Sequence, residues 1–340
     1  MNIKHAELIP FEPRFSGGKA YVQSISVQTE LSNCLLRITT DDGLMGTGEV
    51  VRFPHASIKE ANNRDKVVVK KLAGVNFSAI PSVLRDWNSK GKAYKSLSYA
   101  LDCAWHDLLS QRTELPLSAL LGGALTNAVP EILSLSAGTA EETVTRIRAN
   151  AGATPVVQIK LGVDDLDTDL ATVSAVLAAL HDHQRVLADF NGALALDVAL
   201  DSIVTFAHPQ LMWEDPCSTY EENVSVSRKM NAPMLIDSSL WGLEMISRAV
   251  ADDVKAVCIK PAKFGGLGAA RAARDICVAA GMNIRIDGPW AGQHYTYSAL
   301  ALAVGVPAPQ LIGCIDLTEP LETEHDTIAR PAPGRIGPAC

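Results

Sequence analysis

The sequence lacks the long apolar segments of membrane-spanning and secreted proteins. No stretch approaches the roughly 18 apolar residues that cross a bilayer. The start, MNIKHAELIP, also lacks the apolar run of about seven residues or more that marks a signal peptide. We therefore expect a cytoplasmic protein that has no membrane partner.

Positive charge is scarce as well. The chain carries 30 Lys and Arg against 38 Asp and Glu, which gives a net charge of −8. A polyanion would be repelled by this balance, so nucleic acid is not an expected partner. Any anionic partner must be small and neutralised locally.

Cysteine usage and composition bound the class of protein. The seven cysteines are scattered without CxxC pairs, and the odd count argues against a disulfide framework. With 47% hydrophobic residues and no low-complexity tract, the chain has the composition of a globular protein. Its 340 residues suffice for one large α/β barrel plus a smaller unit, or for two to three ordinary domains.

The most informative feature is a series of five apolar runs that each end in a charged residue. The runs are VVQIK, VLADF, LMWED, MLIDS and AVCIK, and the charges are Lys160, Asp189, Glu214, Asp237 and Lys260. Such regular spacing is the step of one strand, one helix and two loops in a parallel βαβ series. Charges at the ends of buried parallel strands lie at the sheet edge that carries chemistry.

The rest of the chain predicts an α/β protein with two parts. Residues 20–30, 33–40 and 44–50 are strand-like and predict a three-stranded meander, followed by an amphipathic helix over 96–111. From about residue 128 strands alternate with Ala-rich helices, and three further strands at VPEILSLS, NIRID and LIGCID bring the total to eight. We predict an α+β domain over 1–125, a barrel over 126–318, and a segment 319–340 that returns to the first domain.

Three carboxylates flanked by two lysines suggest a divalent metal between two proton carriers. Asp189, Glu214 and Asp237 could each supply a hard oxygen ligand to Mg²⁺, and Lys160 and Lys260 lie one strand before and one strand after them. A nearby cation would lower a lysine pKa towards that of a useful base. The alternatives are acids that cap helices, lysines that neutralise an acidic barrel mouth, and an aldolase that uses Lys260 as a Schiff base.

Several motifs in order carry a family resemblance. The chain contains TTDDGLMGTGE, ALDCAWHDL and LLGG, followed by QIK, DFN, WEDP, IDS and KPAKFGG. In these features it resembles the enolase superfamily, in its muconate lactonising and mandelate racemase branch. The resemblance implies an α+β capping domain over a (β/α)7β TIM-like barrel, with Mg²⁺ beneath the cap and a small-molecule carboxylate as substrate. We also expect a homo-oligomer.

Narrower phrases resemble the members that act on proline-type substrates. These phrases are VQIKLG, EDPC, GGLGAARAARD and DGPWAG. They imply cis-3-hydroxy-L-proline dehydratase activity, or racemisation or epimerisation of proline, hydroxyproline or its betaine. A barrel that has lost activity and only binds a ligand is the alternative of another class.

The family pattern suggests further site residues. Gln158 stands where relatives often carry a first lysine, and strand alternation puts it on the face of Lys160, where it could hold substrate or orient that lysine. Asn191 is expected either to support Asp189 or to cap the next helix. Lys263 is predicted to be solvated in a loop.

Other residues are candidates for binding the substrate. Asp287 and Trp290 could grip a substrate ammonium, by ion pairing and by stacking of the cation on the indole. For Trp290 the alternative is an ordinary packed aromatic. Asp316 on the eighth strand and Tyr94 in the first domain are the remaining candidates.

Overall fold

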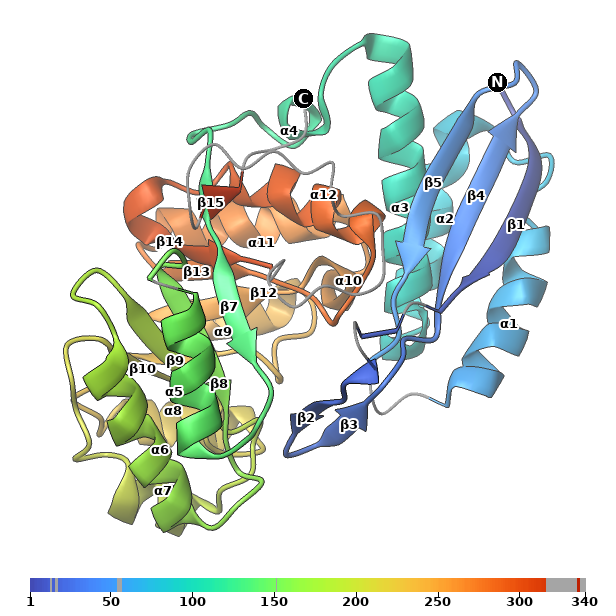
Figure 1. Cartoon of the computed structure of the whole chain (residues 1–340). Helices are drawn as coiled ribbons and strands as arrows, with labels where there is room; N and C mark the ends of the chain where they lie inside the picture. Colours follow the sequence, from blue (N-terminus) through green and yellow to red (C-terminus); the bar gives the residue numbers. More distant parts are fainter. Residues whose placement is uncertain (13, 16–17, 54–56, 151, 316–334, 337–340) are drawn as a thin grey trace.

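The computed structural model describes residues 1–12, 14–15, 18–53, 57–150, 152–315 and 335–336. They form a capping domain, blue to blue-green in Figure 1, and an eight-stranded barrel, green to red. The connection between the two parts runs from the short helix α4 (Leu117–Leu120) to β6 (Val129–Pro130). The predicted architecture, a cap beside an α/β barrel, is confirmed.

The sheet of the cap has three antiparallel strands in the order β1-β4-β5. They are β1 (Ile3–Phe11), β4 (Asn33–Thr40) and β5 (Met45–Val50). The prediction that residues 20–30 supply the first strand of this meander is wrong. That segment forms a separate hairpin, β2 (Tyr21–Gln23) and β3 (Ser26–Gln28), whereas the N-terminal residues pair with β4. The hairpin extends from the cap towards the barrel (Figure 1).

Helices pack on one side of this sheet. They are α1 (Ile58–Lys70), α2 (Ile80–Ser89) after the 3-10 turn η2 (Phe77–Ala79), and α3 (Lys92–Thr113). The predicted apolar stripe of α3 is fully buried at Leu97, Ala100, Leu101, Ala104 and Leu108. β5 lies so close to this helix that a Cβ added at Gly48 would come 2.0 Å from the Ala100 carbonyl oxygen, so only glycine fits there.

The barrel contains eight parallel strands in sequence order, from β7 to β14. They are β7 (Ile132–Leu135), β8 (Val156–Lys160), β9 (Arg185–Asp189), β10 (Leu211–Glu214), β11 (Met234–Ile236), β12 (Ala256–Ile259), β13 (Asn283–Ile286) and β14 (Leu311–Cys314). A parallel bridge between Glu131 and Cys314 joins the last strand to the start of the first. The sheet therefore closes on itself, as the count of eight strands predicts.

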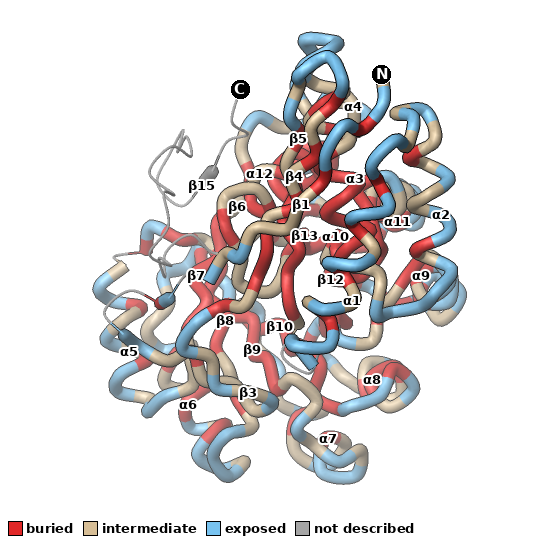
Figure 2. The backbone as a smooth tube through the Cα atoms, turned by 90° about the vertical axis from the view of Figure 1, so that its right-hand side faces the viewer, coloured by how far each residue is buried: buried red, intermediate tan, exposed pale blue. Residues whose placement is uncertain are grey.

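Helices surround the strands on the outside. They are α5 (Ala140–Ala149), α6 (Leu166–Ala179), α7 (Leu196–Ser202), α8 (Tyr220–Ser227), α9 (Leu243–Ala251), the short α10 (Pro261–Phe264), α11 (Leu267–Ala279) and α12 (Gln293–Ala303), with a 3-10 turn η3 (Ala308–Gln310) before β14. Figure 2 shows the strands buried and the outer faces of the helices exposed. The largest core cluster lies between these helices and the strands.

The inside of the barrel has an apolar floor beneath a polar layer. The floor is a cluster of buried side chains from β7 to β12: Ile132, Val156, Leu187, Met212, Leu235, Ala256 and Cys258. Because side chains alternate along a strand, the residue two positions further on also points inward. On β8 to β11 these next inward positions are polar or charged, so the polar layer is a direct result of the strand pattern.

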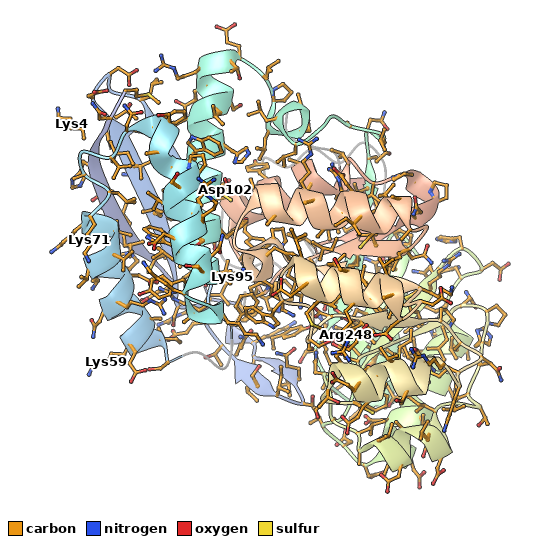
Figure 3. All side chains as sticks on the ribbon, turned by 180° about the vertical axis from the view of Figure 1, so that it is seen from behind. Lys4, Lys59, Lys71, Lys95, Asp102 and Arg248 are labelled. Carbon is orange, nitrogen blue, oxygen red and sulfur yellow. The ribbon has the colours of Figure 1, made fainter. Side chains whose placement is uncertain are left out.

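The cap and the barrel meet along α3. Asp102 of α3 accepts a hydrogen bond from the backbone N–H of Gly268, in the first turn of α11, at 3.1 Å. Figure 3 shows Asp102 on the side of α3 that faces the barrel helices. Glu49 of β5 accepts hydrogen bonds from Gly292 N at 2.8 and 3.0 Å, at the start of α12. Carboxylates of the cap thus satisfy backbone donors at the starts of two barrel helices.

Of the segment 319–340 the structure describes only β15 (Arg335–Ile336), which pairs antiparallel with β6. The expected return of this segment to the cap stays a prediction. No helix of the described residues is long and apolar enough to span a membrane.

Candidate active site

The charged ends of neighbouring strands converge at one edge of the barrel. In the strand register Lys160 lies opposite Asp189, and Asp189 lies opposite Glu214. Asp237 directly follows β11, and Lys260 directly follows β12. The structure therefore brings all five residues of the predicted series together at the carboxyl ends of β8 to β12.

The two lysines contact the carboxylates at opposite sides of the group. Lys160 Nζ donates to Asp189 Oδ2, and Lys260 Nζ donates to Asp237 Oδ2. Both lysines also line the same cavity. Glu214 lies between these ion pairs along the sheet, so the carboxylates form the middle of the arrangement and the amines its flanks.

Gln158 links two of the carboxylates. Its Nε2 donates to Glu214 Oε2 at 2.7 Å and to Asp189 Oδ2 at 3.2 Å. Its Oε1 accepts a hydrogen bond from Ser134 Oγ at 2.9 Å. Gln158 also lines the cavity, so contact with the substrate stays a prediction. Among the described residues no hydrogen bond joins Gln158 to Lys160, and Gln158 orients Asp189 and Glu214 instead.

Burial and crowding of the acids shape their titration. Burial raises the pKa of Glu214 to about 8, and the charge of Asp189 adds to the rise. Burial would also raise the pKa of Asp237, but the adjacent ammonium groups of two lysines hold it well below its usual value. The pKa values of Glu214 and Asp237 are thus shifted in opposite directions.

Without a bound cation, the pKa values of the two flanking lysines are raised. Burial would lower the pKa of Lys160, yet its ion pair with Asp189 raises it above the usual value. The pKa of Lys260 is raised for the same reason by Asp237. A lysine can act as a base here only when other positive charge occupies these carboxylates, because that charge would weaken the ion pairs.

The donor set fits a hard divalent cation. Asp189, Glu214 and Asp237 are at most 3% exposed, and burying several carboxylates together requires compensating positive charge. Ligand atoms of Glu214, Asp237 and Cys258 lie within 4.8 Å of one another, a group that contains two of the three predicted ligands and not Asp189. Carboxylate oxygens from adjacent strand ends are the ligands that Mg²⁺ prefers, whereas a cysteine sulfur suits softer metals.

Asn191 supports Asp189 from the loop after β9. Its backbone N–H donates to Asp189 Oδ1 at 2.7 Å, and its side-chain amide donates to Asp189 Oδ2 at 3.0 Å. Its backbone is left-handed, with φ of 48°, a conformation that asparagine tolerates better than most residues. We therefore assign Asn191 to the orientation of Asp189.

Among the residues that the structure describes, a cavity of about 260 Å³ is lined by Lys160, Asp237, Lys260 and Lys263 of this group, whereas Asp189 and Glu214 do not line it. The cap contributes Tyr21, Gln23 and Gln28 of the hairpin, together with Phe53. The Tyr21 hydroxyl lies 2.6 Å from Ser134 Oγ on β7, which seats the hairpin on the barrel. The cavity is thus lined jointly by the cap and the barrel.

Two predicted substrate contacts, Asp287 and Trp290, line the cavity. Asp287 Oδ2 lies 2.9 Å from Arg285 Nη2 and 3.9 Å from Lys260 Nζ. Trp290 makes edge contacts with Phe15 and Tyr21, with ring centroids 5.4 and 5.1 Å away. Trp290 is therefore both a packed aromatic and part of the wall.

The structure does not bring Tyr94 to the cavity. Tyr94 lies in the first turn of α3, where the guanidinium of Arg64 stacks over its ring at 4.7 Å from the centroid and Lys90 lies at 5.6 Å. Its ring packs on the cap core, because this face of α3 points towards α1 and α2 rather than the barrel. Asp316 lies outside the described residues.

The prediction that Lys263 is solvated is wrong. Lys263 is only 4% exposed, and its Nζ donates to Asp237 Oδ1 at 3.1 Å and to the Asp237 carbonyl oxygen at 3.0 Å. Lys260 precedes the short helix α10, so three residues of helical rise return Lys263 to the same side. Asp237 therefore accepts hydrogen bonds from the ammonium groups of two lysines, Lys260 and Lys263.

Arg285 is a site residue that the sequence analysis missed. It lies inside the barrel on β13 at 2% exposure and lines the cavity. Its guanidinium contacts Glu214, Gln158 and Asp287. The available signal was alternation, since Arg285 stands two residues before Asp287 and so shares its inward face.

Comparison with known proteins defines the family. Residues 139–334 match the enolase C-terminal domain-like family, and residues 18–122 match the mandelate racemase / muconate lactonizing enzyme N-terminal domain. The first match alone covers more than half of the chain. The protein belongs to the enolase superfamily, in its mandelate racemase and muconate lactonizing branch, and is an enzyme of the kind that abstracts an α-proton.

Individual relatives agree with this placement. A cis-3-hydroxy-L-proline dehydratase of Roseibium aggregatum is 28% identical over 309 residues, covering 89% of this chain and 83% of the relative. A mandelate racemase/muconate lactonizing enzyme of Roseovarius nubinhibens has a similar structure, with a TM-score of 0.88 and 25% identity over 99% of this chain and 92% of the other.

A more distant structure shares the fold. The dipeptide epimerase of Enterococcus faecalis, solved with Mg and the dipeptide L-Leu-L-Tyr, gives a TM-score of 0.87 at 22% identity. The match covers 100% of this chain and 98% of the epimerase.

Proposed function

We propose that this protein is a Mg²⁺-dependent enzyme that removes the α-proton of a small, proline-type amino acid carboxylate, most concretely a cis-3-hydroxy-L-proline dehydratase. The observation that carries the proposal is the pair of half-buried lysines, Lys160 and Lys260, on either flank of the carboxylate group in one cavity. With two amines on opposite sides of the bound substrate, one can remove the α-proton while the other delivers a proton to the leaving hydroxyl.

Asp189, Glu214 and Asp237 would hold the cation. When bound, Mg²⁺ supplies fixed positive charge beside the substrate carboxylate, where negative charge grows as the α-proton leaves. Asn191 and Gln158 hold Asp189 and Glu214 in place, and the cation would weaken the ion pairs that Lys160 and Lys260 make with Asp189 and Asp237.

The lysines carry out the proton transfers. One lysine, as the neutral amine, accepts the proton from C2, and the electron pair of that C–H bond passes into the carboxylate to give an enediolate. The other, as the ammonium, gives a proton to the 3-hydroxyl while the C3–O bond breaks. The electron pair then forms the C2–C3 double bond, and water leaves. Atoms and charge balance without an oxidant or a further co-reactant.

The size of the cavity supports a small substrate. Sites for drug-sized ligands are commonly about 300–1,000 Å³, and this cavity is slightly below that range. A single amino acid therefore suits it better than a dipeptide with two large side chains. Trp290 and Asp287 are proposed to contact the ring nitrogen, through the indole face and the carboxylate.

Racemisation or epimerisation of proline, hydroxyproline or its betaine is the second candidate. The same flanking lysines favour it, because removal of the α-proton by one and return by the other on the opposite face inverts the carbon. Both candidates share removal of the α-proton and differ in the second step, which is loss of the hydroxyl in one and reprotonation in the other.

Incubation in D₂O, followed by NMR, tests the proposal. For the dehydratase we expect cis-3-hydroxy-L-proline to be consumed with formation of an unsaturated ring product, and EDTA to abolish turnover. Deuterium at C2 of recovered or inverted substrate, without elimination, would instead identify an epimerase. Failure of every proline-type carboxylate to lose its α-proton would contradict both and leave a barrel that binds without turnover.

A further inference from the structure

Arg285 places a permanent positive charge directly against a predicted metal ligand. Its Nη1 lies 3.3 Å from Glu214 Oε2, and its Nη2 lies 3.2 Å from Gln158 Oε1 and 2.9 Å from Asp287 Oδ2. Arginine is always charged in proteins and presents its donors in a rigid fork. One buried side chain thus ties together the ends of β8, β10 and β13.

The two oxygens of Glu214 are unequal in consequence. Oε2 accepts hydrogen bonds from Gln158 Nε2 at 2.7 Å and from Arg285 Nη1 at 3.3 Å. Among the described residues no hydrogen bond reaches Oε1. With Oε2 occupied by two donors, Glu214 offers a cation one oxygen and is held in that orientation.

Binding through one carboxylate oxygen or through both matters because divalent cations differ in their preferred coordination. Mg²⁺ demands near-ideal octahedral geometry with single oxygens, whereas Ca²⁺ takes six to eight ligands and readily binds both oxygens of one carboxylate. A glutamate restricted to one oxygen therefore penalises Ca²⁺ more than Mg²⁺.

We propose that Arg285, acting with Gln158, is a positioning residue that keeps Glu214 monodentate and thereby makes the site select Mg²⁺ over Ca²⁺. The inference rests on the proposed function, since it takes Glu214 to be a ligand of that cation. The charge of Arg285 alone cannot produce this selectivity, because its repulsion acts on both divalent ions alike.

The experiment measures Mg²⁺ and Ca²⁺ affinities by isothermal titration calorimetry on the whole protein, free of other metals. In Arg285→Met the ratio of the Ca²⁺ to the Mg²⁺ dissociation constant is expected to fall by roughly 10-fold, the lower end of what partners of metal ligands contribute. The ratio is the informative quantity, because changes in net charge and in proton competition at Glu214 affect both ions and cancel. Gln158→Leu, which removes the other donor to Oε2, should shift the ratio in the same direction.

Arg274→Met is the matched control. Arg274 is about as buried as Arg285, at 3% exposure, but its guanidinium contacts the carbonyl oxygens of Leu121 and Leu302 at 2.9 and 3.1 Å and the Asp275 carboxylate at 2.7 Å, and within the described part of the chain it has no hydrogen bond or ion pair with Asp189, Glu214 or Asp237. Loss of this buried arginine should lower stability and leave the affinity ratio unchanged. Arg285→Lys retains the charge without the fork, and we expect it to restore stability more fully than selectivity.

The outcomes distinguish failure of the proposed function from failure of the role inferred for Arg285. A wild-type protein that binds no Mg²⁺ would overturn the proposed function. A wild type that binds Mg²⁺, with an unchanged ratio in both Arg285→Met and Gln158→Leu, would overturn the inference alone. Should Arg285→Met fail to fold, Gln158→Leu and Arg285→Lys decide the matter by the same measurement.

Discussion

Replacement of Lys263 by methionine tests whether the buried ammonium group of Lys263 stabilises the protein by its ion pair with Asp237. The substitution removes donors to Asp237 Oδ1 at 3.1 Å, to the Asp237 carbonyl at 3.0 Å and to the Ser238 carbonyl at 3.3 Å. It also removes a cation 5.6 Å from the centroid of the Trp241 ring. Methionine fills a similar volume, so the loss is chiefly electrostatic.

The expected magnitude comes from the burial of both partners. The side chains of Lys263 and Asp237 are 6% and 4% exposed, and removing one partner of a buried ion pair costs about 3–5 kcal/mol. An unfolding entropy of about 2.1 cal/mol/K per residue gives roughly 0.7 kcal/mol/K for 340 residues that melt together. The melting temperature should therefore fall by about 4–7 °C.

Differential scanning calorimetry measures this shift, with Lys255→Met as the matched control. Lys255 also pairs with an aspartate, Asp253, but their side chains are 69% and 81% exposed, and an exposed pair contributes about 0–1 kcal/mol. Addition of Mg²⁺ should narrow the difference between Lys263→Met and wild type, because the cation supplies charge to Asp237. Equal, small shifts in melting temperature for the two lysine variants would refute the reasoning and indicate that Lys263 is solvated.

Three further predictions concern chemistry, titration and packing. Replacing Lys160 or Lys260 by methionine should lower α-proton exchange, followed by NMR in D₂O, by about 10²–10⁴-fold while the fold persists by circular dichroism. Since the pKa of Glu214 is raised to about 8, Mg²⁺ affinity measured by calorimetry should increase as pH rises towards 8, with proton release. The raised pKa also means that the native state binds more protons than the unfolded state. The metal-free protein should therefore lose stability over the same rise in pH. Gly48→Ala should destabilise the protein by about 1–3 kcal/mol in denaturant melts, because the added Cβ meets the backbone of α3.

The series of strand ends was predictable from the sequence for a simple physical reason. Buried parallel strands are continuous apolar runs, and the first charge after each run marks where the strand leaves the core. Lys160, Asp189 and Glu214 fit this pattern, and the strand register brings them side by side. Order and spacing were enough to place them on neighbouring strands.

The residues that sequence reasoning misplaced depend on local turns and on tertiary pairing. Lys263 returns to the site through the single turn of α10, which the loop interpretation overlooked. Arg285 interrupts an apolar strand, and only the contacts across the barrel reveal that a charge can be satisfied there. The N-terminal segment and the residues of the hairpin have similar strand propensity, so the choice of partner for β4 came from packing rather than from sequence.

Closure of the barrel through the bridge between Glu131 and Cys314 has a consequence for folding. The three proposed Mg²⁺ ligands lie at the ends of β9, β10 and β11, but Gln158 on β8 and Arg285 on β13 hold Glu214 in place, so the segment from β9 to β11 cannot assemble the complete site by itself. Pairing of distant segments is slow to form because it must first overcome the entropy of closing long loops. In refolding experiments the recovery of tight Mg²⁺ uptake should therefore lag behind helix formation and follow the docking of β13, which brings Arg285 to Glu214.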